Sequence, residues 1–553
     1  MSSTQLRPFA RSQVWAPTAT EAAAFDRAAI ERHGVPQAAL MECAGRSAAE
    51  ILGRLFPQGE VLALIGAGNN GGDGLVMLRT LHAWGRPVRA VLVADRDQRA
   101  GGQKPASPAA APAGGPAGDH TPLGQEDLLR GWHIPFEKDD GLGHDSEHLD
   151  TVLRAAAVVV DGILGTGISG APRDRQARAI RAINRSERPV FALDTPSGVN
   201  GDTGQIAGEA VNADVTVAFG WPKLGTLLQP GRSRVGRLIA VEIGFPPVPD
   251  RGFGAAATTP AWAAENWPRR EPDAHKNSVG TLLLVAGRPG MAGAAVMAAR
   301  AALRAGVGLL RVVSSSENRS IIQASVPEAI FVSTEDIDAV REAAAASQAV
   351  GAGPGLGNGA EVGELLAAVL EVSGGLPTVL DADALNLASS GAGPGVAEWA
   401  ADRPVLVTPH LGEMQRLTGL TGEEIEKDRV GAARDLAKTT GAAVLLKGLP
   451  SIVVPPEGTC LVDTMASSDL AAGGMGDVLA GVAASLLAQG VGPNEAGALA
   501  LYGTGRAAAR AALGPSLTPS DVIEQLPAVW TERGSGESDL DHPFVIFDQD
   551  PAR

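Results

Sequence analysis

The chain has 553 residues and a formal net charge of −16, with 44% hydrophobic and 20% charged residues. This length predicts two or three globular units, and the composition excludes an intrinsically disordered chain. The acidic balance argues against a general attraction to nucleic acid phosphates, and two cysteines, Cys43 and Cys460, indicate neither a disulfide framework nor a cysteine metal cluster.

The first thirty residues include Arg7, Arg11 and Glu21 and contain no continuous apolar core, so we expect no secretory signal. No stretch of the sequence is apolar enough to predict a membrane span. Together with the low cysteine count, these features predict a cytoplasmic protein with neither a membrane nor a nucleic acid as a partner.

Apolar runs typical of buried parallel strands recur in the first half of the chain, at Val61–Ile65, Ala157–Val160 and Val190–Leu193. Each run is followed by Gly or Asp, and helical stretches lie between the runs. This alternation predicts an α/β fold with an open, mostly parallel sheet, in which ligands bind at the carboxyl ends of the strands.

Two stretches interrupt this alternation. Residues 99–118 are mostly Gly, Pro and Ala, a composition that cannot bury enough apolar surface to fold, so we expect a flexible insertion there. Pro, Ala and Trp crowd together in residues 246–272, after the strand-like run Arg237–Ile243, and predict a domain boundary.

The alternation resumes with five further strand-like runs, Thr281–Ala286, Ala349–Ala352, Thr378–Asp381, Val405–Thr408 and Ala443–Leu446. The Ala-rich segment Met291–Ala305 is apolar on nearly every face and predicts a buried helix. We therefore expect a first domain at residues 1–245, a linker at 246–270, a second α/β domain at 271–540 and a tail at 541–553.

The segment Gly66–Gly74 places five glycines between the first strand-like run and a helix predicted from Leu75. Glycine in such a turn allows main-chain N–H groups to approach a phosphate, but a purely structural turn explains the glycines equally well. Asn69, Asn70 and Asp73 favour a binding site, since they supply oxygen ligands and hydrogen-bond partners that a structural turn does not need.

Two later segments, Asp161–Gly167 and Asp194–Gly198, each place an acid where a strand opens into a loop. In a parallel sheet these loops and the Gly66–Gly74 turn could converge on one crevice.

These three segments and Met41–Gly45 together resemble the NAD(P)H-hydrate epimerase domain. The resemblance implies a Rossmann-like, three-layer α/β fold, a potassium ion held by Asn70, Asp161 and Ser197, and Asp194 as the acid/base residue. It also implies that the hydrated dinucleotide contacts Asn69, Asn70, Gly71, Gly72, Asp73, Gly165, Thr166, Gly167, Ile168, Ser169, Gly170, Ala171 and Asp194.

The expected reaction interconverts the R and S hydrates at the nicotinamide C6, which requires protons to move on and off the hydroxyl or the ring. A positioned carboxylate performs this task, and Asp194 is the candidate. A helix N-cap or a turn is the alternative role for Asp194. The sequence departs from the family pattern at Cys43, where a polar amide is usual.

Residues Gly473–Leu479 precede an Ala-rich helical segment, so their glycines lie at a predicted helix N-terminus. Unpaired N–H groups and the helix dipole stabilise an anion there by about 1 kcal/mol or more per interaction. Asp477 follows the glycines and can accept a proton from an attacking hydroxyl, which supplies the second part that phosphoryl transfer needs. A loose loop with an N-terminal helix acid is the alternative.

Six further segments precede this turn in order, namely His275–Lys276, Gly287–Ala294, Gly353–Gly357, Asp381–Asn386, Thr408–Glu413 and Leu446–Gly448. The series resembles the ADP-dependent NAD(P)H-hydrate dehydratase of the ribokinase-like superfamily. The resemblance implies that the hydrated dinucleotide contacts Ala294, Gly355, His410 and the catalytic Asp477. It also implies that the adenine nucleotide binds to Lys447, Gly448, Leu449, Pro450, Ser451 and Gly476.

Two of these residues have alternative explanations, His410 as a capping or core histidine and Lys447 as a surface charge. The neighbours Pro409, Gly412 and Glu413 favour a strand-end site for His410. The segment Ser467–Ala472 departs from the family, which usually has an Asn-Pro pair before the glycines.

The two resemblances together predict a bifunctional metabolite repair enzyme. The first domain would interconvert the R and S hydrates, and the second would use ADP to dehydrate the S form, with AMP and phosphate as products. K⁺ in the epimerase domain, Mg²⁺ in the dehydratase domain and assembly into a homo-oligomer are further implications. A ribokinase-like vitamin or sugar kinase fused to a dinucleotide-binding regulatory module is the alternative.

Overall fold

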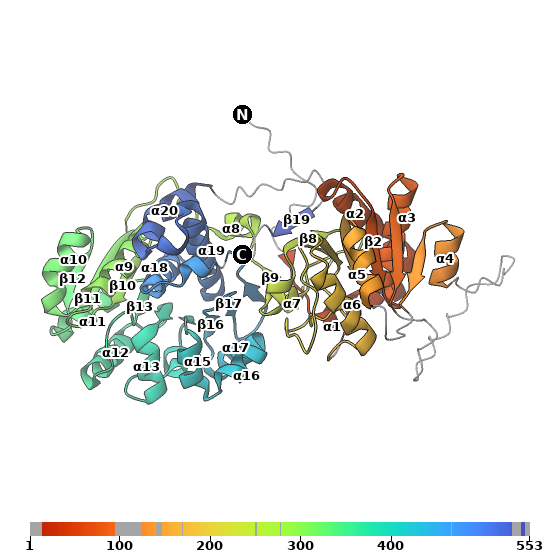
Figure 1. Cartoon of the computed structure of the whole chain (residues 1–553). Helices are drawn as coiled ribbons and strands as arrows, with labels where there is room; N and C mark the ends of the chain where they lie inside the picture. The colour runs from red at the N-terminus through yellow and green to blue at the C-terminus, as the bar shows by residue number, and fades with distance from the viewer. Residues whose placement is uncertain are drawn as a thin grey trace. The chain divides into compact units, whose positions relative to one another are not determined.

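The computed structural model describes residues 14–93, 124–139, 146–168, 170–248, 252–276, 278–465, 467–532 and 544–547. The chain divides into two compact units, which we describe separately (Figure 1). Within the described ranges, the N-terminal unit contains residues 17–248 and 544–547, and the C-terminal unit contains residues 14–16 and 252–532. The insertion expected at residues 99–118 lies outside the described residues.

A sheet with the strand order β19-β8-β7-β6-β5-β2-β3-β4 forms the centre of the N-terminal unit. Its strands are β2 (Val61–Ile65), β3 (Val88–Leu92), β4 (Phe136–Lys138), β5 (Val158–Gly162), β6 (Val190–Leu193), β7 (Val215–Phe219), β8 (Arg237–Val241) and β19 (Phe544–Phe547). All neighbours from β4 to β8 are parallel, and β19 is antiparallel to β8. After β2 the next strands, β3 and β4, are added on one side, and from β5 onward the strands are added on the other side. Open α/β sheets form a ligand crevice at such a switch point, here between the parallel strands β2 and β5.

Helices cover both faces of this sheet (Figure 1). They are α1 (Ala19–Glu31), α2 (Gln37–Leu55), α3 (Asn69–Ala83), α4 (Gln125–Gly131), α5 (Ser146–Ala155), α6 (Asp174–Arg185) and α7 (Leu224–Leu227). Successive side chains of β2 enter two different apolar clusters, with Ala63 and Ile65 in one and Leu62 and Leu64 in the other. Because β2 is buried on both faces, its sequence is continuously apolar.

The helix predicted from Leu75 begins six residues earlier, at Asn69. Glycine explains this early start, because a Cβ at Gly71 would lie 1.9 Å from the Gly66 carbonyl oxygen. The helix can therefore begin directly against the end of β2. Residues Asn69–Asp73 belong to the start of α3 rather than to a loop.

The C-terminal unit has a sheet with the strand order β1-β9-β18-β17-β16-β15-β14-β13-β10-β11-β12. Its strands are β1 (Val14–Trp15), β9 (Ala255–Ala257), β10 (Thr281–Val285), β11 (Leu309–Ser314), β12 (Ile330–Ser333), β13 (Ala349–Ala352), β14 (Thr378–Leu380), β15 (Val405–Val407), β16 (Ala443–Leu446), β17 (Ile452–Val454) and β18 (Cys460–Val462). Neighbours from β12 to β16 are parallel, and the chain direction across the sheet reverses between β10 and β13. The expected strand-like runs are confirmed to within about two residues at their ends.

The helices of this unit are α8 (Pro260–Asn266), α9 (Ala292–Arg304), α10 (Arg319–Ser325), α11 (Ile337–Ala345), α12 (Ala360–Val372), α13 (Ala382–Ser390), α14 (Val396–Trp399), α15 (Leu411–Thr418), α16 (Gly422–Lys427), α17 (Arg429–Thr440), α18 (Met475–Ala488), α19 (Pro493–Ala511) and α20 (Pro519–Glu532). The predicted buried helix is confirmed as α9, whose alanines join the main apolar cluster. It packs closely on α18, since a Cβ at Gly481 would lie 2.2 Å from the Ala298 carbonyl oxygen.

Terminal and connecting segments contribute strands to both sheets. Strand β1 pairs antiparallel with β9, and β9 pairs parallel with β18. The stretch expected as a linker thus contains β9 and α8 of the C-terminal unit, and the stretch expected as a tail contains β19 of the other unit. The prediction of two α/β domains is confirmed. None of the helices within the described ranges meets the length and apolarity that a membrane crossing requires.

Candidate active sites

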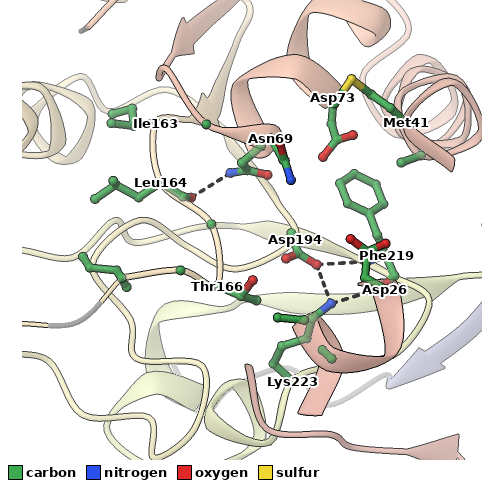
Figure 2. Close-up of a pocket in the computed structure, with 18 of the residues that line it drawn as sticks. Asp26, Met41, Asn69, Asp73, Ile163, Leu164, Thr166, Asp194, Phe219 and Lys223 are labelled. Atoms are coloured by element: carbon green, nitrogen blue, oxygen red, sulfur yellow. Dashed lines mark hydrogen bonds and ion pairs between the residues drawn. The ribbon is translucent and has the colours of Figure 1, made fainter. Parts of the chain in front are cut away.

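A cavity of about 790 Å³ lies at the carboxyl edge of the N-terminal sheet (Figure 2). The predicted site residues in its wall are Asn69, Asn70, Asp73, Gly165, Thr166, Gly167, Ile168 and Asp194. The predicted contacts Gly71, Gly72, Gly170 and Ala171 are not part of the described wall, and Ser169 lies outside the described residues. Gly72 instead packs on Met41, whose Sδ would lie 2.8 Å from a Cβ at that position.

Asp194 follows β6 with a backbone φ of 60°, a conformation that non-glycine residues rarely adopt. Its Oδ1 accepts a hydrogen bond of 2.6 Å from the Lys223 ammonium and one of 3.2 Å from the Phe219 N–H. Lys223 is buried and also donates to the carbonyl oxygens of Phe219 and Trp221. Asp194 caps none of the described helices, and its partners fix the orientation of its carboxylate in the cavity wall.

The carboxyl groups of Asp26 from α1 and Asp73 from α3 also line this cavity (Figure 2). Burial, followed by repulsion from Asp194, raises the pKa of Asp73 well above its usual range. Burial also raises the pKa of Asp26, although the attraction of Lys223 opposes it. Asp73 therefore retains a proton at pH values where an exposed carboxyl group is ionised.

Sequence reasoning missed Asp26 and Lys223. Lys223 lies just beyond the carboxyl end of β7, a position that could have marked it as a candidate, as it did for Asp194. Asp26 is one of three acids in an Ala-rich helix, and no local pattern distinguishes it from a surface residue.

The three residues expected to hold potassium are brought together through Leu164. Asp161 is fully buried and accepts hydrogen bonds of 2.6 Å from the Ser197 hydroxyl and 2.7 Å from the Ser197 N–H. The Asn70 side-chain nitrogen donates to the Leu164 carbonyl oxygen, which also lies 3.3 Å from the Ser197 Oγ. The Asn70 Oδ1 is buried without a hydrogen-bond partner.

This group of oxygens fits a weakly charged, oxygen-binding cation. Burial raises the pKa of Asp161 to about 6, so a nearby positive charge would stabilise its ionised form. Among the described residues, no cluster of three or more His, Cys, Asp or Glu side chains is arranged to hold a metal ion. A donor set of one carboxylate with neutral oxygens is compatible with potassium, whereas transition metals favour imidazole or thiolate ligands.

In the C-terminal unit, the loops after β10 and β13 meet at the point where the strand order reverses. The Gly287 N–H donates to the Pro354 carbonyl oxygen and the Arg288 N–H to that of Gly355, over 2.9 and 2.7 Å. The predicted contacts Ala294 and Gly355 lie side by side, since a Cβ at Gly355 would be 2.9 Å from the Ala294 Cβ.

The Gly473–Asp477 turn lies at a helix N-terminus, as predicted. Gly474 precedes α18 with φ of 90°, and Gly476 and Asp477 belong to the first turn of this helix. Burial, followed by repulsion from Asp381, raises the pKa of Asp477 to about 7. Asp477 can therefore exchange a proton near neutral pH, which suits a general base.

Lys447 is not a surface charge, because only 20% of its side chain is exposed. Its ammonium donates a hydrogen bond of 2.7 Å to Asp381. Burial alone would lower the pKa of Lys447, but the attraction of Asp381 and Glu413 outweighs it and raises the pKa. The ammonium would lie 3.6 Å from a Cβ at Gly476, so two of the predicted nucleotide contacts are neighbours. Gly448, Leu449, Pro450 and Ser451 follow Lys447 after the end of β16, and the Ser451 hydroxyl bonds to Gly448.

His410 has the capping role that was one of its two explanations. Its Nδ1 accepts hydrogen bonds of 3.0 Å from the Gly412 N–H and 3.3 Å from the Glu413 N–H at the start of α15. The side chain is 55% exposed and can still contact a ligand. Glu413, for which no role of its own was predicted, is buried with Oε2 3.9 Å from the Lys447 ammonium.

The structure describes both departures from the family pattern in part. Cys43 is exposed on α2, whereas Leu40, Met41 and Ala44 of the same helix line the N-terminal cavity. Residues Ser468–Leu470 form a 3₁₀ turn, in which the Ser467 hydroxyl accepts from the Asp469 N–H.

The two units define a two-domain α/β enzyme with a carboxylate-lined cavity in one unit and an acid beside a helix N-terminus in the other. A family profile described as "YjeF-related protein N-terminus" matches residues 37–225, and one described as "NAD(P)H-hydrate dehydratase" matches residues 282–528.

Two relatives match nearly the whole chain. The bifunctional NAD(P)H-hydrate repair enzyme Nnr of Salinibacter ruber is 36% identical over 550 residues, and that of Moorella thermoacetica is 35% identical over 532 residues. Each match covers 93% of this chain and 96% of the relative. A solved structure of the ADP/ATP-dependent NAD(P)H-hydrate dehydratase from Bacillus subtilis, co-crystallised with ATP and Mg²⁺, is 30% identical, covers 50% of this chain and 97% of that chain, and has a TM-score of 0.44. The chain belongs to the family of bifunctional NAD(P)H-hydrate repair enzymes.

Proposed function

We propose that this chain catalyses both steps of NAD(P)H-hydrate repair, with the epimerase site in the N-terminal unit and the dehydratase site in the C-terminal unit. The observation that carries the dehydratase assignment is the position of Asp477, an acid with a pKa of about 7, in the first turn of α18 and near the partly buried Lys447. A base, an anion-binding helix N-terminus and a cation are the parts that phosphoryl transfer requires.

The dehydratase reaction uses these parts in two steps. Asp477 takes the proton of the C6 hydroxyl while the hydroxyl oxygen bonds to the terminal phosphorus of ADP, and AMP leaves. The ring nitrogen then expels phosphate from C6, and loss of a proton from C5 restores the reduced nicotinamide. Phosphate is a far better leaving group than hydroxide. Ala294, Gly355 and His410 would contact the hydrate, and Lys447–Ser451 with Gly476 the nucleotide.

Mg²⁺ would neutralise charge on the nucleotide phosphates. Since the described residues form no cluster of three or more ligating side chains, the phosphates themselves would supply most of its ligands, as is common for this ion.

The epimerase reaction is assigned to the cavity of the N-terminal unit, with Asp194 as the acid/base residue. Its support is the fixed carboxylate of Asp194 in a wall shared with Asn69, Asp73 and the Gly165–Ile168 segment. Potassium would be held by Asn70, Asp161 and Ser197 and would supply a fixed positive charge beside the cavity. The unpartnered Asn70 Oδ1 supports this part of the proposal.

Incubation of the purified chain with ADP and the S hydrate of NADH tests the dehydratase assignment. We expect the reduced-nicotinamide absorbance to rise, with AMP and phosphate released in equal amounts. A stable phosphorylated product without that rise would instead support the kinase alternative.

Incubation with the pure R hydrate, without ADP, tests the epimerase assignment separately. We expect a mixture of R and S forms, and replacement of K⁺ by tetramethylammonium should slow its formation. Binding of the hydrate without any interconversion would support the regulatory-module alternative.

The proposal also includes a cytoplasmic location, a homo-oligomer and functional domains bounded near residues 245 and 271. Light scattering of the purified protein tests self-association, and limited proteolysis tests the domain boundaries.

A further inference from the structure

Asp381 lies directly after β14 at the N-cap position of α13, where an aspartate normally accepts hydrogen bonds from its own helix. Its side chain makes no such cap bond. Its Oδ1 instead accepts 2.7 Å hydrogen bonds from the Lys447 ammonium and from the Thr408 hydroxyl, which follow β16 and β15. The carboxylate is thus committed to the site rather than to the helix.

The backbone around Asp381 is held in place at a cost. The next residue, Ala382, has φ of 46°, a conformation that residues with a Cβ rarely adopt. On the other side, a Cβ at Gly353 would lie 1.7 Å from the Asp381 carbonyl oxygen, so only glycine permits this approach. Strain of this kind persists where the surrounding structure determines one geometry, and it concentrates at functional sites.

The partner of Asp381 lies beside the anion-binding turn. The Lys447 ammonium and the Asp381 Oδ2 would lie 3.6 and 3.8 Å from a Cβ at Gly476. Asp381 itself is 2% exposed, so its charge is only weakly screened by water.

We propose that Asp381 is a positioning residue for the dehydratase reaction, which holds the Lys447 ammonium beside the Gly473–Gly476 turn and places a fixed negative charge near the base Asp477. In this role Asp381 acts through Lys447 and Asp477. This inference rests on the proposed dehydratase function.

The charges that face Asp477 support this role. Asp381 and Asp383, from the β14 end, raise the pKa of Asp477, and Lys447 lowers it, while burial has the largest effect. Helix α9, which packs on α18, carries two charged residues, Arg300 and Arg304, and both form ion pairs with Glu524 of α20. Loss of the Asp381 charge should therefore lower the pKa of Asp477.

The variant Asp381→Asn of the full-length chain tests the proposal in the ADP-dependent assay with the S hydrate. We expect kcat/KM for ADP to fall about tenfold, the loss typical of a charged hydrogen bond. We also expect the pH midpoint of kcat to move below that of the wild type, since Asp477 ionises more easily. The matched control is Asp336→Asn, an N-cap aspartate that does bond to its own helix α11, through the Ala339 N–H.

A purely structural role would lower the thermal stability without moving the pH midpoint. A folded Asp381→Asn protein with the midpoint and kcat/KM of the wild type overturns the proposal.

If Asp381→Asn does not fold, the variant Thr408→Val tests the proposal instead, because it removes one hydrogen bond from Asp381 and keeps the charge. This variant should raise KM for ADP while kcat stays near that of the wild type, because it disturbs the site that holds Lys447 and keeps the charge near Asp477. A wild-type kcat/KM, or a loss confined to kcat, overturns the proposal. An inactive wild-type protein would instead contradict the proposed function itself.

Discussion

Lys223 is the residue that the N-terminal site depends on most among those that sequence motifs did not reveal. Its buried ammonium makes the short bond to Asp194 and two further bonds to carbonyl oxygens. Without it, the Asp194 carboxylate keeps, among the described residues, the longer bond from the Phe219 N–H.

The variant Lys223→Met should therefore slow epimerisation at least about tenfold, because a charge-assisted hydrogen bond contributes roughly 1.5–3 kcal/mol. The R-to-S conversion rate without ADP measures the effect. Lys138→Met is the control, since its lysine forms a partly exposed ion pair with Glu126 that contributes little. An unchanged rate in Lys223→Met would show that Asp194 does not need this partner.

The raised pKa of Asp477 predicts how the rate of the dehydratase reaction depends on pH. Its raised pKa of about 7 means that the carboxyl group is mostly protonated below that pH, and a protonated group cannot accept the hydroxyl proton. The rate should therefore rise with pH through about 7 and fall roughly tenfold per pH unit below it. A kcat that stays constant from pH 5 to pH 8 would contradict the role of Asp477 as base.

At the residue scale, sequence motifs predicted Asp194, Asp477 and Lys447 but not the network around them. Glycine-rich turns and strand ends are local patterns that can be read directly. The bond from Lys447 to Asp381 joins residues 66 positions apart, and its existence depends on the order of strands in the folded sheet. The capping bonds of His410 likewise show that a local role and a site position can coincide.

Helices α9 and α18 show how small residues set the architecture at the scale of elements. Continuous apolar runs predicted strands such as β2 and β6, because a strand buried on both faces leaves a clear pattern. The same pattern was not recognised at β7, although it is equally buried. The start of α3 was not predictable, because a glycine that opens a loop and one that allows close packing look alike in sequence. Only the approach of Gly71 to the Gly66 carbonyl oxygen distinguishes them.

The contact between α9 and α18 predicts opposite effects for two Gly→Ala changes. Gly481→Ala should lower the stability of the C-terminal unit by about 1–3 kcal/mol, because the new methyl group meets the Ala298 carbonyl oxygen. Gly293→Ala in α9 should be neutral or stabilising, since its Cβ has no neighbour within 4 Å and Ala favours a helix. Calorimetry of both variants checks the pair, and equal unfolding temperatures would contradict the packing explanation.

At the scale of the whole molecule, the two α/β units were predictable from two series of strand-like runs and the composition shift between them. The strands contributed by residues 14–15 and 544–547 were not. A strand at the edge of a sheet is short and gains its partner only in the folded unit, so its sequence carries little signal.

Because the two sites lie on one chain, a variant of the epimerase site should affect conversion of the R hydrate and leave dehydration of the S hydrate unchanged. The variant Asp194→Asn should still dehydrate the S hydrate at the wild-type rate but should fail to consume the R hydrate. Chiral separation of the remaining hydrate measures this directly, and loss of both activities would point to misfolding, which circular dichroism identifies.

The most direct test of the account is the extent of NADH recovery from an equal mixture of R and S hydrates, incubated with excess ADP and the full-length protein. We predict that all of the hydrate is converted to NADH, with one AMP released per NADH formed. Recovery that stops at half, with the R form left over, would contradict the epimerase assignment. The absence of any ADP-dependent recovery would contradict the dehydratase assignment at Asp477.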